Sequence, residues 1–106
     1  MVCKYQFTDI AVVDLDKILN YITNELSNDF ASKNLFSKIE KTIDNICLFP
    51  KSFPIVENSF VSDKDIRKVS VDNYIMYYKY EEDSNIVSIL RIVYGKMNLD
   101  KIISHL

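Results

Sequence analysis

The sequence contains very little glycine or proline, with one Gly and two Pro among 106 residues, and no tryptophan. This scarcity leaves few positions for special turns or long irregular loops. No apolar run approaches the roughly 20 residues that a membrane-spanning helix needs. Hydrophobic residues make up 48% of the chain and charged residues 26%. We therefore expect a single folded domain over residues 1–106 rather than a disordered chain.

A surplus of cations is also missing. Lys and Arg number 13 against 15 Asp and Glu, which gives a formal net charge of −2. Proteins that bind nucleic acid usually carry a clear basic excess, because phosphate contacts supply much of the affinity. Any basic surface here must therefore be local. The N-terminus shows no basic stretch followed by an apolar run, so we expect no signal peptide, no membrane association and a cytoplasmic location.

Cysteine is rare as well, and Cys3 and Cys47 match no metal-binding or redox spacing. In a cytoplasmic protein the ordinary state of two such residues is the free thiol. We therefore expect two free thiols, no metal site and no cofactor.

The first half of the chain predicts one strand and two helices. Val2–Phe7 alternates in the manner of a strand, and Thr8 and Asp9 then offer helix N-caps. Apolar residues follow at helical spacing: Ile10, Leu15, Ile18, Leu19, Ile22 and Leu26. Ser27-Asn28-Asp29 provides a second cap, and the next apolar stripe runs as far as Pro50: Phe30, Ala31, Leu35, Ile39, Ile43 and Ile46. The short link predicts an antiparallel helix hairpin.

The second half predicts three strands, Ile66–Val71, Tyr74–Tyr80 and Ile86–Tyr94, after an irregular stretch over Lys51–Lys64. Short turns between the strands favour an antiparallel sheet. The last strand is apolar on both faces, which is typical of a central strand. Helical spacing in residues 98–106 leaves a short C-terminal helix or a tail open. The predicted fold is α+β, with the order β-α-α-β-β-β in two layers.

Four segments, taken in order, resemble toxins of the RelE/ParE superfamily, the toxic halves of bacterial type II toxin–antitoxin pairs. The segments are Thr8-x-x-Ala11-x-x-Asp14-Leu15-x-x-Ile18-x-x-Tyr21-Ile22, Ile43-x-x-Ile46-x-Leu48-Phe49-Pro50-x-x-Phe53-Pro54, Arg67-Lys68-Val69-x-Val71-x-Asn73-Tyr74-x-x-x-Tyr78 and Ile89-Leu90-Arg91-Ile92-x-Tyr94-Gly95-Lys96. The likeness spans most of the chain and is closer to the ParE branch. It implies a RelE/ParE-like fold, growth arrest and plasmid stabilisation.

The ribonuclease branch of this superfamily cuts messenger RNA on the ribosome and needs cations around the scissile phosphate. On the family pattern, Arg67, Lys68 and Lys96 would be the catalytic candidates. Arginines expected after the middle-strand tyrosine and after the Gly-Lys pair are replaced here by Ile75 and Met97. An arginine fork is not replaced by either side chain, so such a site would transfer phosphoryl groups poorly.

The ParE branch inhibits DNA gyrase by protein contact and needs no catalytic set, which fits this chain better. The resemblance implies an antitoxin partner that wraps the helix pair and the sheet, and a toxin that exposes an apolar groove when alone. Partner-binding candidates are Arg67, Lys68, Tyr74, Arg91, Tyr94 and Lys96. An mRNA endoribonuclease and an attenuated, non-toxic relative stay open as alternatives.

Arg91 lies within the most apolar strand, on the face that alternation assigns to Val87, Ile89 and Val93. A buried unpaired charge is costly, so this guanidinium should reach an acid, an edge or a bound partner. Candidate internal partners are Asp72, Glu57 and Asp100. The many tyrosines of these strands are more typical of a half-buried sheet than of a base-stacking surface.

Overall fold

In the part of the chain that the structure describes, four strands form one sheet in the order β1-β4-β3-β2. The structure, a computed structural model, describes residues 3–56 and 65–96. Strand β1 (Lys4–Phe7) runs parallel to β4 (Ile86–Tyr94), which pairs antiparallel with β3 (Tyr74–Glu81), and β3 pairs antiparallel with β2 (Ile66–Val71). The predicted α+β fold and the central position of the last strand are confirmed. The expected C-terminal helix or tail lies outside the described residues.

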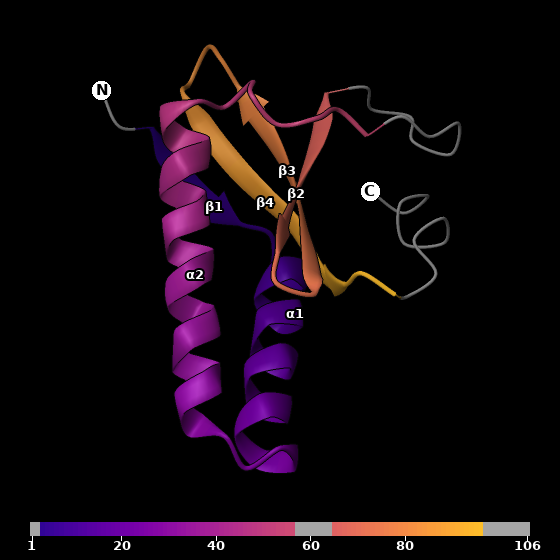
Figure 1. Cartoon of the computed structure of the whole chain (residues 1–106). Helices are drawn as coiled ribbons and strands as arrows, with labels where there is room; N and C mark the ends of the chain where they lie inside the picture. The colour runs from indigo at the N-terminus through magenta and orange to yellow at the C-terminus, as the bar shows by residue number, and fades with distance from the viewer. Residues whose placement is uncertain (1–2, 57–64, 97–106) are drawn as a thin grey trace.

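Two helices, α1 (Asp9–Asn20) and α2 (Asp29–Leu48), form the predicted hairpin and lie side by side (Figure 1). The Thr8 hydroxyl caps α1 by accepting from the Ala11 amide, and the Asn28 side chain caps α2 by accepting from the Ala31 amide. The main core lies between this hairpin and one face of the sheet. Its most buried members are Ala11, Leu35, Ile39, Ile43, Ile46, Met76, Tyr78, Val87, Ile89 and Ile92.

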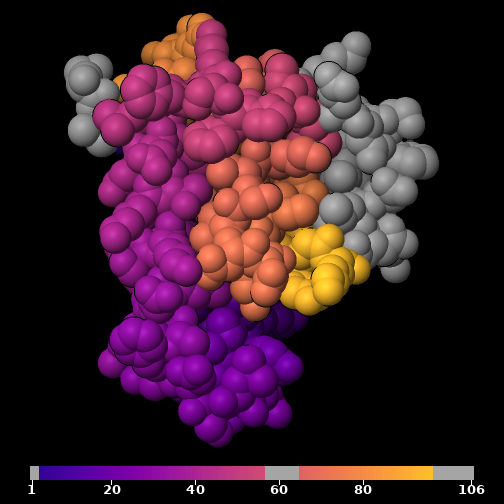
Figure 2. Space-filling model, in the orientation of Figure 1, coloured from indigo at the N-terminus to yellow at the C-terminus, as the bar shows by residue number. Residues whose placement is uncertain are grey.

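The end of the first helix departs from the predicted stripe, because Tyr21–Glu25 forms a π-helical turn. The Leu26 amide donates to the Tyr21 carbonyl, and the wider turn changes which side chains face inward. Ile22 is buried, as the stripe predicted, whereas Leu26, the next member of the stripe, is exposed. The tip of the hairpin projects beyond the sheet (Figure 2).

A bulge in β4 also differs from simple alternation. Tyr77 pairs with Arg91 and Tyr78 pairs with Ile89, so Leu90 is an extra residue on this strand. Val87 and Ile89 consequently face the helices, whereas Val93 packs with Tyr77 in a second cluster. The predicted grouping of Arg91 with all three apolar residues was wrong because the bulge reverses the faces beyond Ile89.

The first turns of α1 close the part of the β4 edge that β1 does not reach. Strand β1 pairs with β4 only as far as Ile89. Beyond it, the Thr8 hydroxyl donates to the Leu90 carbonyl at 2.9 Å, and the Asp14 carboxylate accepts from the Ile92 amide at 3.1 Å. The side chains of Thr8 and Asp14 thus form the hydrogen bonds that a neighbouring strand would otherwise make with these backbone groups of β4.

The opposite edge of the sheet is covered by the chain that leaves α2. The Lys68 amide donates to the Pro54 carbonyl, and the Val56 amide donates to the Ile66 carbonyl at 2.8 Å. The Tyr78 hydroxyl donates to the Pro50 carbonyl at 2.8 Å and fixes the start of this segment. The irregular stretch is therefore ordered by backbone pairing as far as Val56.

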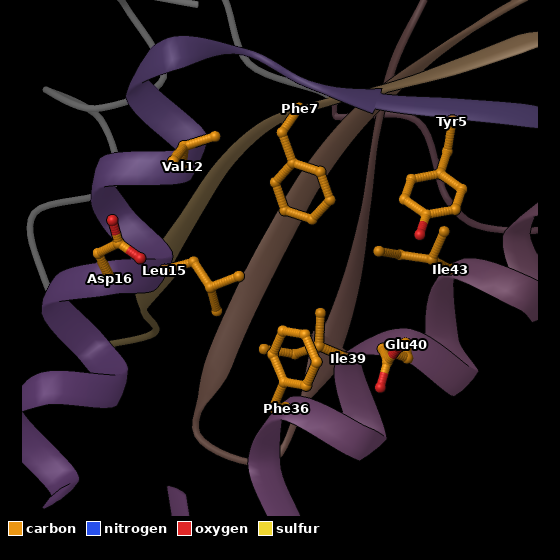
Figure 3. Close-up of a pocket in the computed structure, with 9 residues that line it drawn as sticks. All are labelled: Tyr5, Phe7, Val12, Leu15, Asp16, Phe36, Ile39, Glu40 and Ile43. Atoms are coloured by element: carbon orange, nitrogen blue, oxygen red, sulfur yellow. The ribbon is translucent and has the colours of Figure 1, made fainter. Parts of the chain in front are cut away.

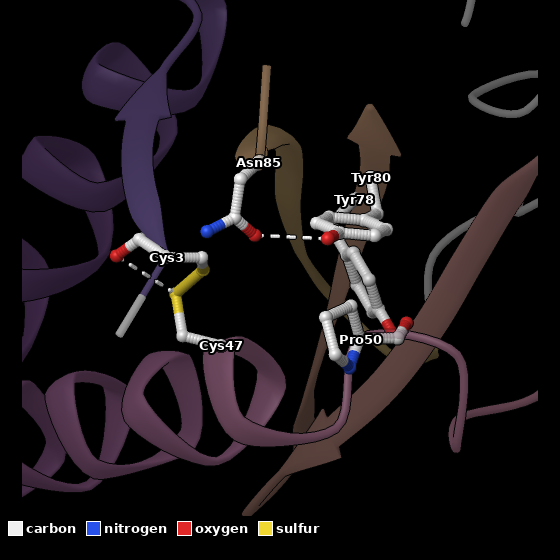
Figure 4. The surroundings of a disulfide bond; sticks show 6 residues. All are labelled: Cys3, Cys47, Pro50, Tyr78, Tyr80 and Asn85. Carbon is white, nitrogen blue, oxygen red and sulfur yellow. Dashed lines mark hydrogen bonds between the residues drawn. A yellow bond between two sulfur atoms is a disulfide. The ribbon is translucent and has the colours of Figure 1, made fainter. Parts of the chain in front are cut away.

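Cys3 and Cys47 form a disulfide in the structure, so the expectation of two free thiols was wrong. The start of β1 lies against the last turn of α2, which brings two residues separated by 44 positions to a Cα–Cα distance of 5.1 Å (Figure 4). Both residues are buried in the main core. Spacing along the chain could not indicate this pair, because the fold alone brings the two residues together.

Replacing Asp14 by alanine should lower the free energy of unfolding by about 2–4 kcal/mol, because it leaves the Arg91 guanidinium and the Ile92 amide without their acceptor. Asp16→Ala is the matched control. Asp16 is exposed on the same helix, so its loss should cost less than about 0.5 kcal/mol. Urea unfolding of the two variants measures the difference. Equal losses would contradict the role given to Asp14.

Stability should also fall at alkaline pH through Tyr78. Burial raises the pKa of this phenol from 10.0 to about 12, against a smaller opposing effect of the Arg67 cation. The stabilisation is therefore complete below pH 10 and is lost as the pH rises towards 12, where the unfolded chain ionises first. Tyr78→Phe should remove up to roughly 1.4 kcal/mol per pH unit of this dependence. Identical slopes for wild type and Tyr78→Phe would refute the assignment.

Candidate functional site

The three candidate catalytic cations do not gather in one site. Arg67 and Lys68 are neighbours on β2, so their side chains leave opposite faces of the sheet. The Arg67 guanidinium donates to the carbonyls of Lys51 at 3.1 Å and Phe53 at 2.7 Å. It therefore holds the segment that follows α2. Lys96 is exposed just beyond the end of β4.

Lys68 lines a pocket of about 320 Å³ at the β2 edge of the sheet. Among the described residues that line it, Lys68 is the sole cation, and the others are Phe53, Pro54, Val69, Ser70 and Ile75. Ile75, which stands where the ribonuclease pattern has arginine, packs against the second cluster. A phosphate bound here would meet one ammonium group and mostly apolar side chains.

Arg91 forms the predicted internal ion pair, but with a different acid. Its Nε and Nη2 atoms donate to the two carboxylate oxygens of Asp14 at 2.7 and 3.0 Å. The hydrogen bond to Asp14 is the main cause that raises the pKa of Arg91. Asp72 instead pairs with Lys38 at 3.1 Å, and Glu57 and Asp100 lie outside the described residues. Arg91 is thus held by the fold and does not present a bare guanidinium to a partner.

Tyr74 and Tyr94 meet edge to face, with ring centroids 5.9 Å apart. They line a pocket of about 590 Å³ between the end of α1 and the start of β3, together with Lys17, Ile18, Tyr21, Leu26 and Asn73. Burial, with smaller contributions from Tyr94, Tyr21 and Asp72, raises the pKa of Tyr74. The prediction of a half-buried sheet holds for Tyr74 and Tyr80, whereas Tyr77 and Tyr78 are fully buried.

An apolar groove of about 230 Å³ runs between the two helices and β1 (Figure 3). We call it the helix groove. The resemblance implied an exposed apolar groove, but the sequence did not indicate these residues as a set. They come from β1, α1 and α2: Tyr5, Phe7, Val12, Leu15, Asp16, Phe36, Ile39, Glu40 and Ile43. Val12 and Phe36 are large apolar residues outside the predicted core stripes. This position was the one sequence feature that could have indicated an apolar surface between the helices.

Carboxylates stand on both helical walls of this groove. Asp16 belongs to α1 and Glu40 to α2, and both are exposed (Figure 3). Neither has an ion-pair partner in the described part of the chain. The groove therefore combines an apolar floor with negative charge at its sides, which suits an apolar segment that carries a cation.

Large apolar side chains are also exposed around the hairpin, including Ile10, Val13 and Phe30, of which Phe30 is 81% exposed. Ile10 and Phe30 lie near the starts of α1 and α2, and therefore at opposite ends of the antiparallel hairpin, so these side chains do not form one contiguous apolar patch.

Within residues 3–56 and 65–96, no group of three or more His, Cys, Asp and Glu residues is arranged to hold a metal ion. None of the helices in the same ranges has the length and apolar character required to span a bilayer.

Known proteins share this architecture. The fold is similar to that of the toxin–antitoxin complex RelBE2 from Mycobacterium tuberculosis, with a TM-score of 0.61 and 16% identity over 89% of this chain and 99% of that one. The chromosomal ParDE system from P. aeruginosa gives a TM-score of 0.67 and 13% identity over 90% and 98% of the two chains. A mutant of the E. coli toxin RelE in the free state gives 0.68 and 10% over 99% and 96%.

At these identities the solved structures establish the fold alone, and no curated protein matches the sequence. The family model for the "ParE toxin of type II toxin-antitoxin system, parDE" matches residues 5–99. This match covers most of the chain: among the described elements it spans α1, α2, β2, β3 and β4 in full and β1 except for Lys4. The chain therefore belongs to the ParE family of type II toxin–antitoxin toxins.

Proposed function

We propose that this toxin arrests growth by binding DNA gyrase and that its antitoxin neutralises it by covering the helix groove. The observation that favours protein contact over RNA cleavage is that both arginine side chains are hydrogen-bonded within the fold. Arg67 is bonded to backbone carbonyls and Arg91 is bonded to Asp14. Phosphoryl transfer needs several cations directed at one phosphate, because charge develops there in the transition state.

The pocket at Lys68 supports the same choice. Its described lining contains neither Arg67 nor Lys96, and it includes the apolar side chain of Ile75. A protein that acts by binding a partner does not need several cations directed at one phosphate, since apolar side chains on rigid elements supply its binding energy. The two tyrosines Tyr74 and Tyr94 form such a rigid aromatic pair on the sheet.

The helix groove supports the proposed antitoxin site. Apolar side chains from β1, α1 and α2 form its floor, and Asp16 and Glu40 flank it. An amphipathic segment with an apolar face and a neighbouring Lys or Arg matches both features. Covering this groove would also remove apolar surface that the isolated toxin leaves in water.

Purified toxin should inhibit ATP-dependent supercoiling by DNA gyrase. Lys68→Ala should not abolish this inhibition, because loss of one contact only weakens a protein interface, whereas loss of a catalytic cation abolishes cleavage. Lys33→Ala, another exposed lysine substitution, controls for loss of charge. Addition of the antitoxin in equimolar amount should restore supercoiling. Unchanged supercoiling, combined with mRNA cleavage that Lys68→Ala abolishes, would refute the proposal in favour of a ribonuclease.

Phe36→Glu should weaken binding of the co-expressed antitoxin by about 10-fold or more, because it places a third carboxylate beside the apolar floor of the groove. Phe30→Glu is the matched control. It makes the same change on the same helix, outside the groove lining. Titration calorimetry measures both affinities. Full affinity for Phe36→Glu would show that the antitoxin binds elsewhere.

A further inference from the structure

The disulfide connects the edge of the sheet to the helix hairpin. Cys3 directly precedes β1, and Cys47 lies in the last turn of α2 (Figure 4). Each residue is 6% exposed, so both sulfur atoms are packed in the main core. A bond at this position restrains how far the start of β1 can move from α2.

The chain on the Cys47 side of the disulfide is held on the sheet by several other contacts. Beyond Cys47, the Tyr78 hydroxyl donates to the Pro50 carbonyl, Arg67 donates to the Phe53 carbonyl, and Lys51 pairs with Glu82. These contacts keep the end of α2 on the sheet whether or not the disulfide is present.

Strand β1 is held by its pairing with β4, by the hydrogen bond that the Gln6 side-chain amide donates to the Ser88 hydroxyl at 2.9 Å, and by Phe7 against the main core. It is four residues long, pairs with a single neighbour, and has exposed side chains at Lys4, Tyr5 and Gln6. Short edge strands with exposed side chains open with low free energies. Loss of the disulfide should therefore release β1 and leave α2 in place.

The position of β1 also determines the shape of the helix groove. Tyr5 and Phe7 come from this strand and meet edge to face, with ring centroids 6.2 Å apart. Both rings point into the groove towards side chains of the two helices (Figure 3). If β1 detaches, the groove loses one complete side.

We propose that Cys3 and Cys47 form a reversible redox latch that holds β1 in place and thereby preserves the helix groove. In the disulfide form the groove is complete; in the dithiol form β1 opens and the groove loses its shape. The latch itself involves no partner protein. Its effect on antitoxin binding rests on the proposed function.

The chemistry of the latch is thiol–disulfide exchange. Opening consumes two electrons and two protons, which two molecules of a small thiol such as glutathione supply as they form their own disulfide. The attacking thiolate breaks the Cys3–Cys47 bond, forms a mixed disulfide with one cysteine and displaces the other as a thiolate, which takes up a proton. The second small thiol, as its thiolate, then attacks the sulfur of the first and forms the small-molecule disulfide, and the remaining cysteine leaves and is protonated. Closing reverses these steps with glutathione disulfide as the oxidant.

Amide hydrogen exchange on the full chain tests the latch without antitoxin or gyrase. The Lys4 amide, which donates to the Asn85 carbonyl, reports on β1, and the Val56 amide, which donates to the Ile66 carbonyl, reports on the opposite edge. Reduction should speed exchange at Lys4 by about 10-fold or more and leave Val56 within about twofold. Methyl signals of Leu15 and Ile43 in the groove should shift, whereas those of Ile66 should not.

The double variant Cys3→Ser/Cys47→Ser should behave as the reduced chain and should not respond to reductant. If this variant fails to fold, the comparison of oxidised and reduced wild type decides alone. An unchanged rate of amide exchange at Lys4 on reduction would refute the latch. An equal increase in the exchange rates of Lys4 and Val56 would also refute it, because it would show that the disulfide stabilises the whole domain and not β1 in particular. Because neither readout involves a partner, failure of the latch and failure of the proposed function remain distinguishable.

Discussion

The carboxylate of Asp14 joins the first helix to the central strand of the sheet. It accepts two hydrogen bonds from Arg91 and one from the Ile92 amide, at the edge that β1 leaves uncovered. The Asp14 side chain is 12% exposed and that of Arg91 is 24% exposed, so water replaces these bonds poorly if one partner is removed. The position of α1, and with it one wall of the helix groove, depends on this contact.

This constraint bears directly on function, because it occupies a guanidinium that a nuclease could otherwise direct at phosphate. Arg67 is occupied in the same way by the carbonyls of Lys51 and Phe53. Both arginines therefore build the scaffold that presents the helix groove and the Tyr74–Tyr94 pair. A family fold that supports different activities is used here, on our account, for contact with other proteins.

Much of the fold could be predicted from local patterns. Helical spacing located α1 and α2, and continuous apolarity placed Ile86–Tyr94 at the centre of the sheet. Polar residues narrowed the caps to Thr8 or Asp9 and to Ser27-Asn28-Asp29, from which the structure selects Thr8 and Asn28. The missed features all depend on residues far apart in the chain. Asp14 and Arg91 are 77 positions apart and Cys3 and Cys47 are 44 apart, and no local pattern indicates either pair. The Leu90 bulge was also missed, since an apolar run gives no sign of an inserted residue. Of the candidate site residues, Tyr74 and Tyr94 come together, whereas Arg67 and Lys68 diverge.

The most direct test of the central claim is the order in which syntheses stop when the toxin is induced in bacteria. Pulse-labelling of DNA and protein over the first minutes separates the two targets. A toxin that acts by contact with gyrase should reduce DNA synthesis first and induce a DNA-damage response, with protein synthesis falling later. An early loss of protein synthesis, with DNA synthesis intact, would contradict the account and show that the chain acts on translation.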